Sequence, residues 1–165
     1  MSFNQTLMVR HGSYYSGRAE ALTEDGERES VRARDELIQR GIGRGAVLLS
    51  STAPRALQTA AIIGEGLSLQ VKSSKRIEII GNYPEGVSSL DEMLEAALSE
   101  SETDTGGEAL IVVTHQPLIN IAANRHNVGY GEIWLYEPTT WFNPQFSSYD
   151  QGRLQEDLAA ANLIA

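Results

Sequence analysis

The stretch QTLMVRHG (residues 5–12) points to the fold, because an apolar run stops abruptly on a cation, an imidazole and a glycine. Residues 5–10 have the continuous apolar character of a short strand buried on both faces, as in parallel sheets. Three similar segments follow along the chain: GAVLLSS (45–51), EALIVVTH (108–115) and GEIWLYE (131–137). We therefore expect these four segments to form strands of one sheet.

The segments between these strands have helical patterns. The first begins with Thr23 as an N-cap before an acidic first turn. Its apolar face is expected to consist of Val31, Leu37 and Ile38. Further helices are expected over residues 53–67, 87–101 and 151–162. Because strands alternate with helices, we expect one α/β domain over residues 1–165, a three-layer sandwich with a mainly parallel central sheet.

The composition excludes several classes of function. The chain has 165 residues and a formal net charge of −9, with no cluster of Lys and Arg, so nucleic acid is not an expected partner. It has no cysteine, which excludes disulfides, thiolate zinc ligands and a cysteine nucleophile. No apolar stretch approaches the roughly 20 residues of a membrane helix, and Arg10 comes too early for a secretory leader. We therefore expect a cytoplasmic protein with no membrane partner.

Polar side chains stand at the ends of three of these strands. The first strand ends at Arg10 and His11, the second precedes a helix that carries Arg55, and a later strand ends at position 115 with a second histidine, His115. Ligands gather at the carboxyl ends of parallel strands, because the loops leave there. Arginine offers a planar fork of donors suited to phosphate oxygens, and imidazole serves as nucleophile, donor or proton shuttle. These residues predict a site that binds and transfers a phosphoryl group.

A metal centre is the alternative chemistry for such a site. A phosphatase-type centre needs several carboxylates and histidines together, and the chain has only three histidines. The third, His126, follows Arg125 in what reads as a polar helix end and is expected at the surface. We therefore expect no metal and no cofactor.

Four segments in this order and spacing closely resemble the histidine phosphatase superfamily, also called phosphoglycerate mutase-like. The shared markers are an RHG triplet after a strand, a Leu-Thr-x-x-Gly helix start, a Ser-Ser-x-x-x-Arg-Ala-x-Gln-Thr-Ala segment, and a histidine ending a hydrophobic strand. The segments are LMVRHG (7–12), ALTEDGERES (21–30), LLSSTAPRALQTAAII (48–63) and IVVTHQPLI (111–119). The resemblance covers residues 5–121 and implies a phosphoglycerate mutase-like fold.

The resemblance implies roles for individual residues. His11 matches the nucleophile that takes the phosphoryl group, and His115 matches the second histidine that donates to the phosphate. Arg10 and Arg55 match the clamp on its oxygens. These roles agree with chemistry, because a neutral imidazole nitrogen can attack phosphorus in line while cationic donors offset charge on the equatorial oxygens. Gly12, without a Cβ, is expected to let backbone N–H groups approach the phosphate.

The general acid is left open among three possibilities. In the branch that acts on small phosphate esters, an acidic residue in a segment similar to EIIGNYPEG (78–86) protonates the leaving oxygen, and its spacing to glycine matches Glu78. Glu85 is the nearby competitor. The third possibility is that Glu78 is an exposed carboxylate at a strand end and no acid is needed.

Departures from the family pattern narrow the expected function. Mutase branches show glutamate, threonine and then asparagine after RHG, where this chain has Ser13, Tyr14 and Gly17. The chain is also too short for their inserted cap, so a shallow, open site is expected, and the segment THQPLI is similar to that of short bacterial phosphohistidine phosphatases. Two roles are open for a further set of residues, which either line the entrance to the site or are ordinary loop residues: Tyr14, Tyr15, Arg18 and 143–150.

The sequence thus predicts a metal-independent phosphatase that hydrolyses a phosphomonoester or phosphohistidine through a phosphohistidine enzyme intermediate. Its expected partner is a phosphorylated small molecule or a phosphoprotein. Two alternatives remain: a phosphoglycerate mutase-type phosphotransferase, and a catalytically weak phosphate-binding scaffold protein.

Overall fold

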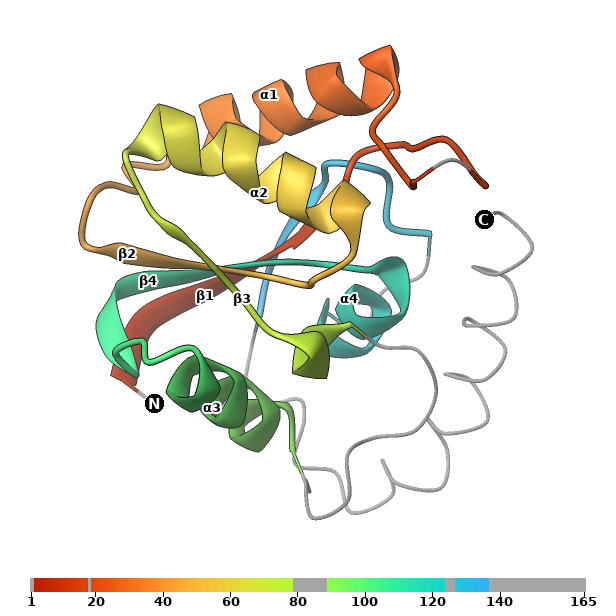
Figure 1. Cartoon of the computed structure of the whole chain (residues 1–165). Coiled ribbons are helices and arrows are strands. Elements are labelled where there is room, and N and C mark those ends of the chain that lie inside the picture. The colour runs from red at the N-terminus through yellow and green to blue at the C-terminus, as the bar shows by residue number, and fades with distance from the viewer. Residues whose placement is uncertain (1, 18, 79–88, 124–126, 137–165) are drawn as a thin grey trace.

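The computed structural model describes residues 2–17, 19–78, 89–123 and 127–136 (Figure 1). Its strands are β1 (Ser2–Arg10), β2 (Ala46–Ser50), β3 (Val71–Ser73), β4 (Gly106–Thr114) and β5 (Ile133–Leu135). Its helices are α1 (Glu24–Gln39), α2 (Pro54–Leu67), α3 (Leu90–Glu100) and α4 (Gln116–Ala123), with a single 3₁₀ turn, η1 (Lys75–Ile77).

The five strands form one sheet in the order β3-β2-β4-β1-β5. The pairs β2–β3, β2–β4 and β1–β4 are parallel, and only β5 runs antiparallel, beside β1 at the edge. The mainly parallel sheet predicted from the sequence is therefore confirmed. Since β1 and β4 are direct neighbours, with Arg10 opposite Thr114, the residues that follow the two strands leave the sheet side by side.

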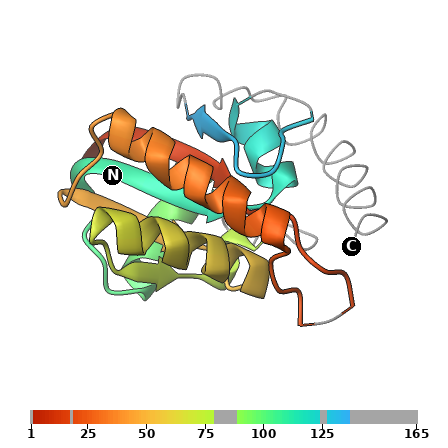
Figure 2. The same ribbon diagram turned by 90° about the horizontal axis from the view of Figure 1, so that it is seen from above.

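Helices cover both faces of the sheet, which confirms the three-layer arrangement. Alternate residues of β1 divide between two buried clusters: Leu7 and Val9 pack with α1 and α2, and Met8 packs with α3 and α4. Figure 2 shows α1 and α2 side by side over one face. Because both faces are covered, the central strands are apolar almost throughout, as parallel strands generally are.

Local sequence signals explain where the helices begin. The Thr23 side chain accepts a hydrogen bond from the Gly26 N–H at the start of α1, as the N-cap pattern predicted. Pro54 stands in the first turn of α2, where its missing N–H costs no hydrogen bond. Ser89 caps α3 in the same way as Thr23 caps α1.

Several expectations need correction. Ile38 does not belong to the apolar face of α1, since it is 47% exposed, whereas Leu37 is fully buried. The helix whose end was expected near Arg125 is α4, and its start at Gln116, directly after a strand end, was not identified from the sequence. The expected helix over 151–162 lies outside the described residues. Within them, no helix is both long and apolar enough to cross a bilayer.

Candidate active site

The structure brings together His11, His115, Arg10 and Arg55 at the carboxyl edge of the sheet. His11 follows β1 and His115 follows β4, and their ring centroids lie 5.1 Å apart. Arg55 reaches both rings from the first turn of α2. The convergence inferred from strand order is therefore present, and its direct cause is the parallel pairing of β1 with β4.

Hydrogen bonds define the tautomer of His11. Its Nδ1 lies 2.8 Å from the Gly12 carbonyl oxygen, which can only accept, so we assign the proton to Nδ1. Nε2 then carries a lone pair, and it accepts from Arg55 Nε at 3.3 Å. Burial, followed by the charge interaction with His115, lowers the pKa of His11 well below its ordinary value. The ring is therefore neutral at pH 7, with an unprotonated nitrogen beside a cation.

His115 has the opposite tautomer. Arg55 Nη2 lies 3.3 Å from Nδ1, and because a guanidinium only donates, Nδ1 accepts. Nε2 therefore carries the proton and donates to Ser51 Oγ at 2.8 Å. Burial, then the charges of Arg55 and Arg10, lowers the pKa of His115 to about 3. In this state the nitrogen that faces Arg55 has no proton, so donation to a phosphate requires a change of tautomer or protonation.

Arg55 contacts both histidines and a carboxylate. Its Nε and Nη2 donate to the two histidines, and its Nη1 donates to Glu20 Oε2 at 2.5 Å. The ring of Tyr14 lies over the guanidinium, 4.4 Å from its central carbon. All three guanidinium nitrogens are thus engaged, and two of them face the histidines.

Arg10 is a second buried cation, 9% exposed. Its Nη1 donates to the Val128 carbonyl oxygen, and its guanidinium lies 3.9 Å from the centre of the Tyr130 ring. Within the described part of the chain, its Nε has no hydrogen-bond partner. Burial lowers the pKa of Arg10. A buried guanidinium with an unpaired N–H next to His11 suits an anion, because leaving such a donor unsatisfied is costly.

Gly12 has a packing role that the sequence did not predict. Its N–H donates to Thr59 Oγ1 at 3.0 Å, so this backbone donor is already occupied by the protein. A Cβ on Gly12 would lie 2.4 Å from the Gly26 carbonyl oxygen, and a Cβ on Gly26 would lie 2.0 Å from the Ser13 carbonyl oxygen. The glycines of RHG and Leu-Thr-x-x-Gly therefore let the end of β1 pack directly against the first turn of α1.

Glu78 lies close to the site but touches neither histidine ring in any recorded contact. It follows η1, is partly buried, and accepts a hydrogen bond from Thr52 Oγ1 at 2.8 Å. Thr52 is the neighbour of Ser51, so Glu78 is tied to the loop that also holds His115. The competitor Glu85, together with His126, Arg18 and residues 143–150, lies outside the described residues.

Sequence reasoning missed three contributors. Glu20 pairs with Arg55, Tyr130 covers Arg10, and Ser51 holds His115. The Ser-Ser pair of the third marker was a usable signal for Ser51. Glu20 and Tyr130 stand in loops without a pattern, so only the folded chain places them.

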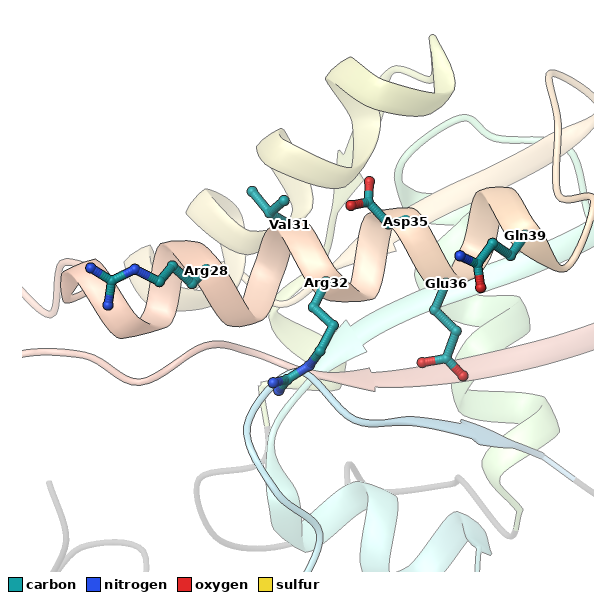
Figure 3. Close-up of a pocket in the computed structure, with 6 residues that line it drawn as sticks. All are labelled: Arg28, Val31, Arg32, Asp35, Glu36 and Gln39. Carbon is teal, nitrogen blue, oxygen red and sulfur yellow. The ribbon is translucent and has the colours of Figure 1, made fainter.

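A second hollow in the described part of the chain lies away from these histidines. A hollow along α1 is lined by Arg28, Val31, Arg32, Asp35, Glu36 and Gln39, all on one helix (Figure 3). Arg32 reaches from it to the Tyr130 carbonyl oxygen at 3.4 Å. Among the residues that the structure describes, no three His, Asp or Glu side chains are grouped as a metal ion would require.

Solved structures with the same fold come from phosphatases. The putative phosphohistidine phosphatase SixA from Agrobacterium tumefaciens superposes with a TM-score of 0.59 at 14% identity, covering 87% of this chain and 100% of that one. The protein histidine phosphatase SixA complexed with tungstate gives 0.57 at 19% identity, covering 82% and 98%. Mycobacterial glucosyl-3-phosphoglycerate phosphatase Rv2419c gives 0.55 at 20% identity, covering 78% and 88%. At these identities the likeness establishes the fold.

The sequence comparison gives a family match over the first part of the chain. No curated protein matches the chain. The family model described as histidine phosphatase superfamily (branch 1) matches residues 5–81, a stretch that contains Arg10, His11, Arg55 and Glu78. His115 lies beyond that match, and the pairing of β4 with β1 brings it to His11. The family match and the shared fold thus agree: the first part of the chain is similar to the histidine phosphatase superfamily, and the chain has the fold of solved phosphatases.

Proposed function

We propose that this protein is a phosphatase that hydrolyses a phosphomonoester or phosphohistidine through a phosphohistidine intermediate on His11. One observation carries the proposal: His11 Nε2 holds a lone pair, because Nδ1 donates to the Gly12 carbonyl, and this nitrogen lies 3.3 Å from Arg55 Nε. A nucleophile of this kind must be neutral to attack, and the lowered pKa keeps it so.

In the first step, the Nε2 lone pair attacks phosphorus in line and the bond from phosphorus to the leaving group breaks. The leaving group takes its electron pair and a proton. Protonated Glu78 supplies this proton when the leaving atom is an alkoxide oxygen, whereas a leaving nitrogen takes it from solvent, to which Glu78 returns the proton that it gains in the second step. In the second step, water attacks the phosphoryl group, its proton passes to the Glu78 carboxylate, and the P–N bond breaks with return of the pair to Nε2. Phosphate and neutral His11 result.

Charge on the transferring group is offset by Arg10 and Arg55 rather than by a metal ion. Arg10 has a buried Nε–H without a partner among the described residues, and Arg55 turns Nε and Nη2 toward the histidines. Preorganised donors of this kind stabilise charge that develops in the transition state. His115 also donates to the phosphoryl group once its Nδ1 is protonated. The charges of Arg55 and Arg10 lower the pKa of His115, and an incoming dianion opposes this effect and so favours protonation.

Structures with this fold include enzymes for two substrate classes. SixA is a protein histidine phosphatase, and Rv2419c is a glucosyl-3-phosphoglycerate phosphatase. For this chain we favour a phosphohistidine or another substrate with a good leaving group. Glu78 is held by Thr52 and makes no recorded contact with either histidine, and a nitrogen leaving group needs the least help from an acid.

The test is hydrolysis of para-nitrophenyl phosphate together with trapping of the intermediate. The wild type should release phosphate and, after a rapid quench with labelled substrate, carry acid-labile, alkali-stable label on His11. His11→Ala should lose both. The control is Arg28→Ala, on the exposed face of α1, which should keep both. Label on another residue, or full activity of His11→Ala, would refute the mechanism. Transfer to an acceptor alcohol in preference to water would support a phosphotransferase instead.

A further inference from the structure

The side chain of Glu20 pairs with Arg55 on the side of the site that faces solvent. Its Oε2 lies 2.5 Å from Arg55 Nη1 in an ion pair. The Arg55 side chain is 14% exposed, whereas the Glu20 side chain is 43% exposed. The carboxylate therefore stands at the rim of the site and not at its floor.

The loop that carries Glu20 holds it there. Residues on either side of the loop tip pair with each other: Tyr14 forms an antiparallel bridge with Leu22, and the Tyr15 N–H donates to the Ala21 carbonyl. At the tip, Ala19 and Glu20 have φ angles of 50° and 53°, in the left-handed region. Non-glycine residues adopt this region rarely, and two in succession indicate a backbone held for the sake of the side chain it presents.

The guanidinium of Arg55 has one edge toward the histidines and one nitrogen toward Glu20 at the rim of the site. Its Nε and Nη2 turn toward His11 and His115, so this edge of the planar guanidinium faces the phosphoryl group. Its Nη1 faces Glu20. A phosphoryl group bound on this edge would engage Nε and Nη2, so the contact of Nη1 with the Glu20 carboxylate can stay in place beside the substrate.

We propose that Glu20 is a specificity-determining residue that disfavours substrates with a second anionic group close to the phosphate and favours neutral or cationic leaving groups. This inference rests on the proposed phosphatase function and names its substrate class. The favoured substrates include phosphoramidates and phosphorylated side chains in a basic peptide. Phosphorylated carboxylic acids belong to the disfavoured class. The physical cause is direct: two like charges several ångströms apart in a partly exposed site repel, and salt screens that repulsion.

The test uses three phenyl phosphates with the same skeleton, which carry a meta carboxylate, carboxamide or aminomethyl group. For the wild type, kcat/KM should fall in the order cation, neutral, anion, with about a tenfold span. Glu20→Gln, which keeps the shape and can still accept from Arg55, should reduce the span to about twofold. Glu24→Gln is the matched control, because Glu24 is an exposed carboxylate four residues away on α1 and should keep the full span.

Two further measurements separate charge selection from a structural role. Raising the ionic strength to about 0.5 M should reduce the span in kcat/KM for the wild type and leave the span for Glu20→Gln unchanged. A folding defect would instead lower kcat/KM for all three substrates together. Dissociation constants for the same esters, measured by calorimetry, should show the same order without requiring turnover. Hydrolysis of all three esters with equal kcat/KM would overturn the Glu20 inference alone. Failure to bind or hydrolyse any of them would overturn the proposed phosphatase site, and the inference with it.

Discussion

Ser51 Oγ lies 2.8 Å from His115 Nε2, and it accepts the proton that the contact of Arg55 Nη2 with Nδ1 keeps on Nε2. Ser51 is fully buried at the end of β2, and its oxygen also accepts from the Ala53 N–H at 3.2 Å. A hydroxyl can donate as well as accept. The same contact therefore allows His115 to move its proton to Nδ1 when a phosphate arrives, with Ser51 then donating to Nε2.

Removal of this hydroxyl should impair the site without removing a group that touches substrate. Ser51→Ala is expected to lower kcat about tenfold, the equivalent of one hydrogen bond of about 1.4 kcal/mol. The neighbouring Ser50→Ala, whose hydroxyl donates to the Ser51 carbonyl oxygen, is the control and should retain activity. Nitrogen-15 NMR should show the Nε2–H tautomer of His115 in the wild type and a mixture in Ser51→Ala. An unchanged tautomer in Ser51→Ala would contradict the assigned role.

The lowered pKa of His115 should make the protein less stable in acid. The unfolded chain takes up a proton near pH 6.5, whereas the folded state does so only near pH 3. Between these values the unfolded state binds more protons, so the free energy of unfolding should fall as the pH decreases below 6.5. At pH 5 this one histidine should cost about 2 kcal/mol relative to pH 7.5. Urea unfolding at the two pH values measures the loss, and His115→Asn should lose about that much less.

Activity should be insensitive to chelation. The phosphate charge is assigned to Arg10, Arg55 and His115, so incubation with EDTA followed by assay in chelated buffer should leave the rate unchanged. Inorganic vanadate, which mimics the five-coordinate transition state, should inhibit equally with and without EDTA. Loss of turnover on chelation with recovery on addition of Zn²⁺ or Mn²⁺ would place the protein in a metal-dependent class.

Glu78 should matter in proportion to the basicity of the leaving group. Glu78→Gln should lose about 10² to 10⁴ in rate on alkyl phosphates, and much less on para-nitrophenyl phosphate or phosphohistidine. Glu100→Gln, a carboxylate paired with Arg76 in a part-exposed bridge, is the control. Equal losses on all substrates would indicate a structural role for the Thr52–Glu78 contact. No loss on any substrate would transfer the assignment to Glu85.

The contact between Gly12 and Gly26 should tolerate no side chain. Gly12→Ala forces a methyl group to within 2.4 Å of a backbone oxygen, and we expect a loss of about 3 kcal/mol or more in unfolding free energy. Gly43→Ala is the matched control, because a Cβ there meets nothing within 4 Å. Denaturant unfolding compares the two. Equal stability of the two variants would show that the end of β1 can move away from α1.

The sequence by itself determined four of the five strands of the described sheet, the helices α1, α2 and α3 that flank it, and the meeting of Arg10, His11, Arg55 and His115. Strand and helix periodicities are local, so they can be recognised in the sequence. Because parallel strands have their carboxyl ends at one edge of a sheet, the polar residues at those ends are predicted to form one site. Motif matching reached residue 81, and strand pairing extended the site to His115. The strand β3 and the exposure of Ile38 were not predicted, since neither has a local pattern that distinguishes it.

Only the tertiary structure decided the protonation and the electrostatics of the site. The proton positions on His11 and His115 depend on contacts with the Gly12 carbonyl, Arg55 and Ser51, and the last of these spans 64 residues of sequence. The charge at the rim depends on Glu20, which stands 35 residues before Arg55 in a loop without periodicity. Hydrogen bonds and charge pairs act over a few ångströms in space, so their partners become identifiable only when the chain is folded.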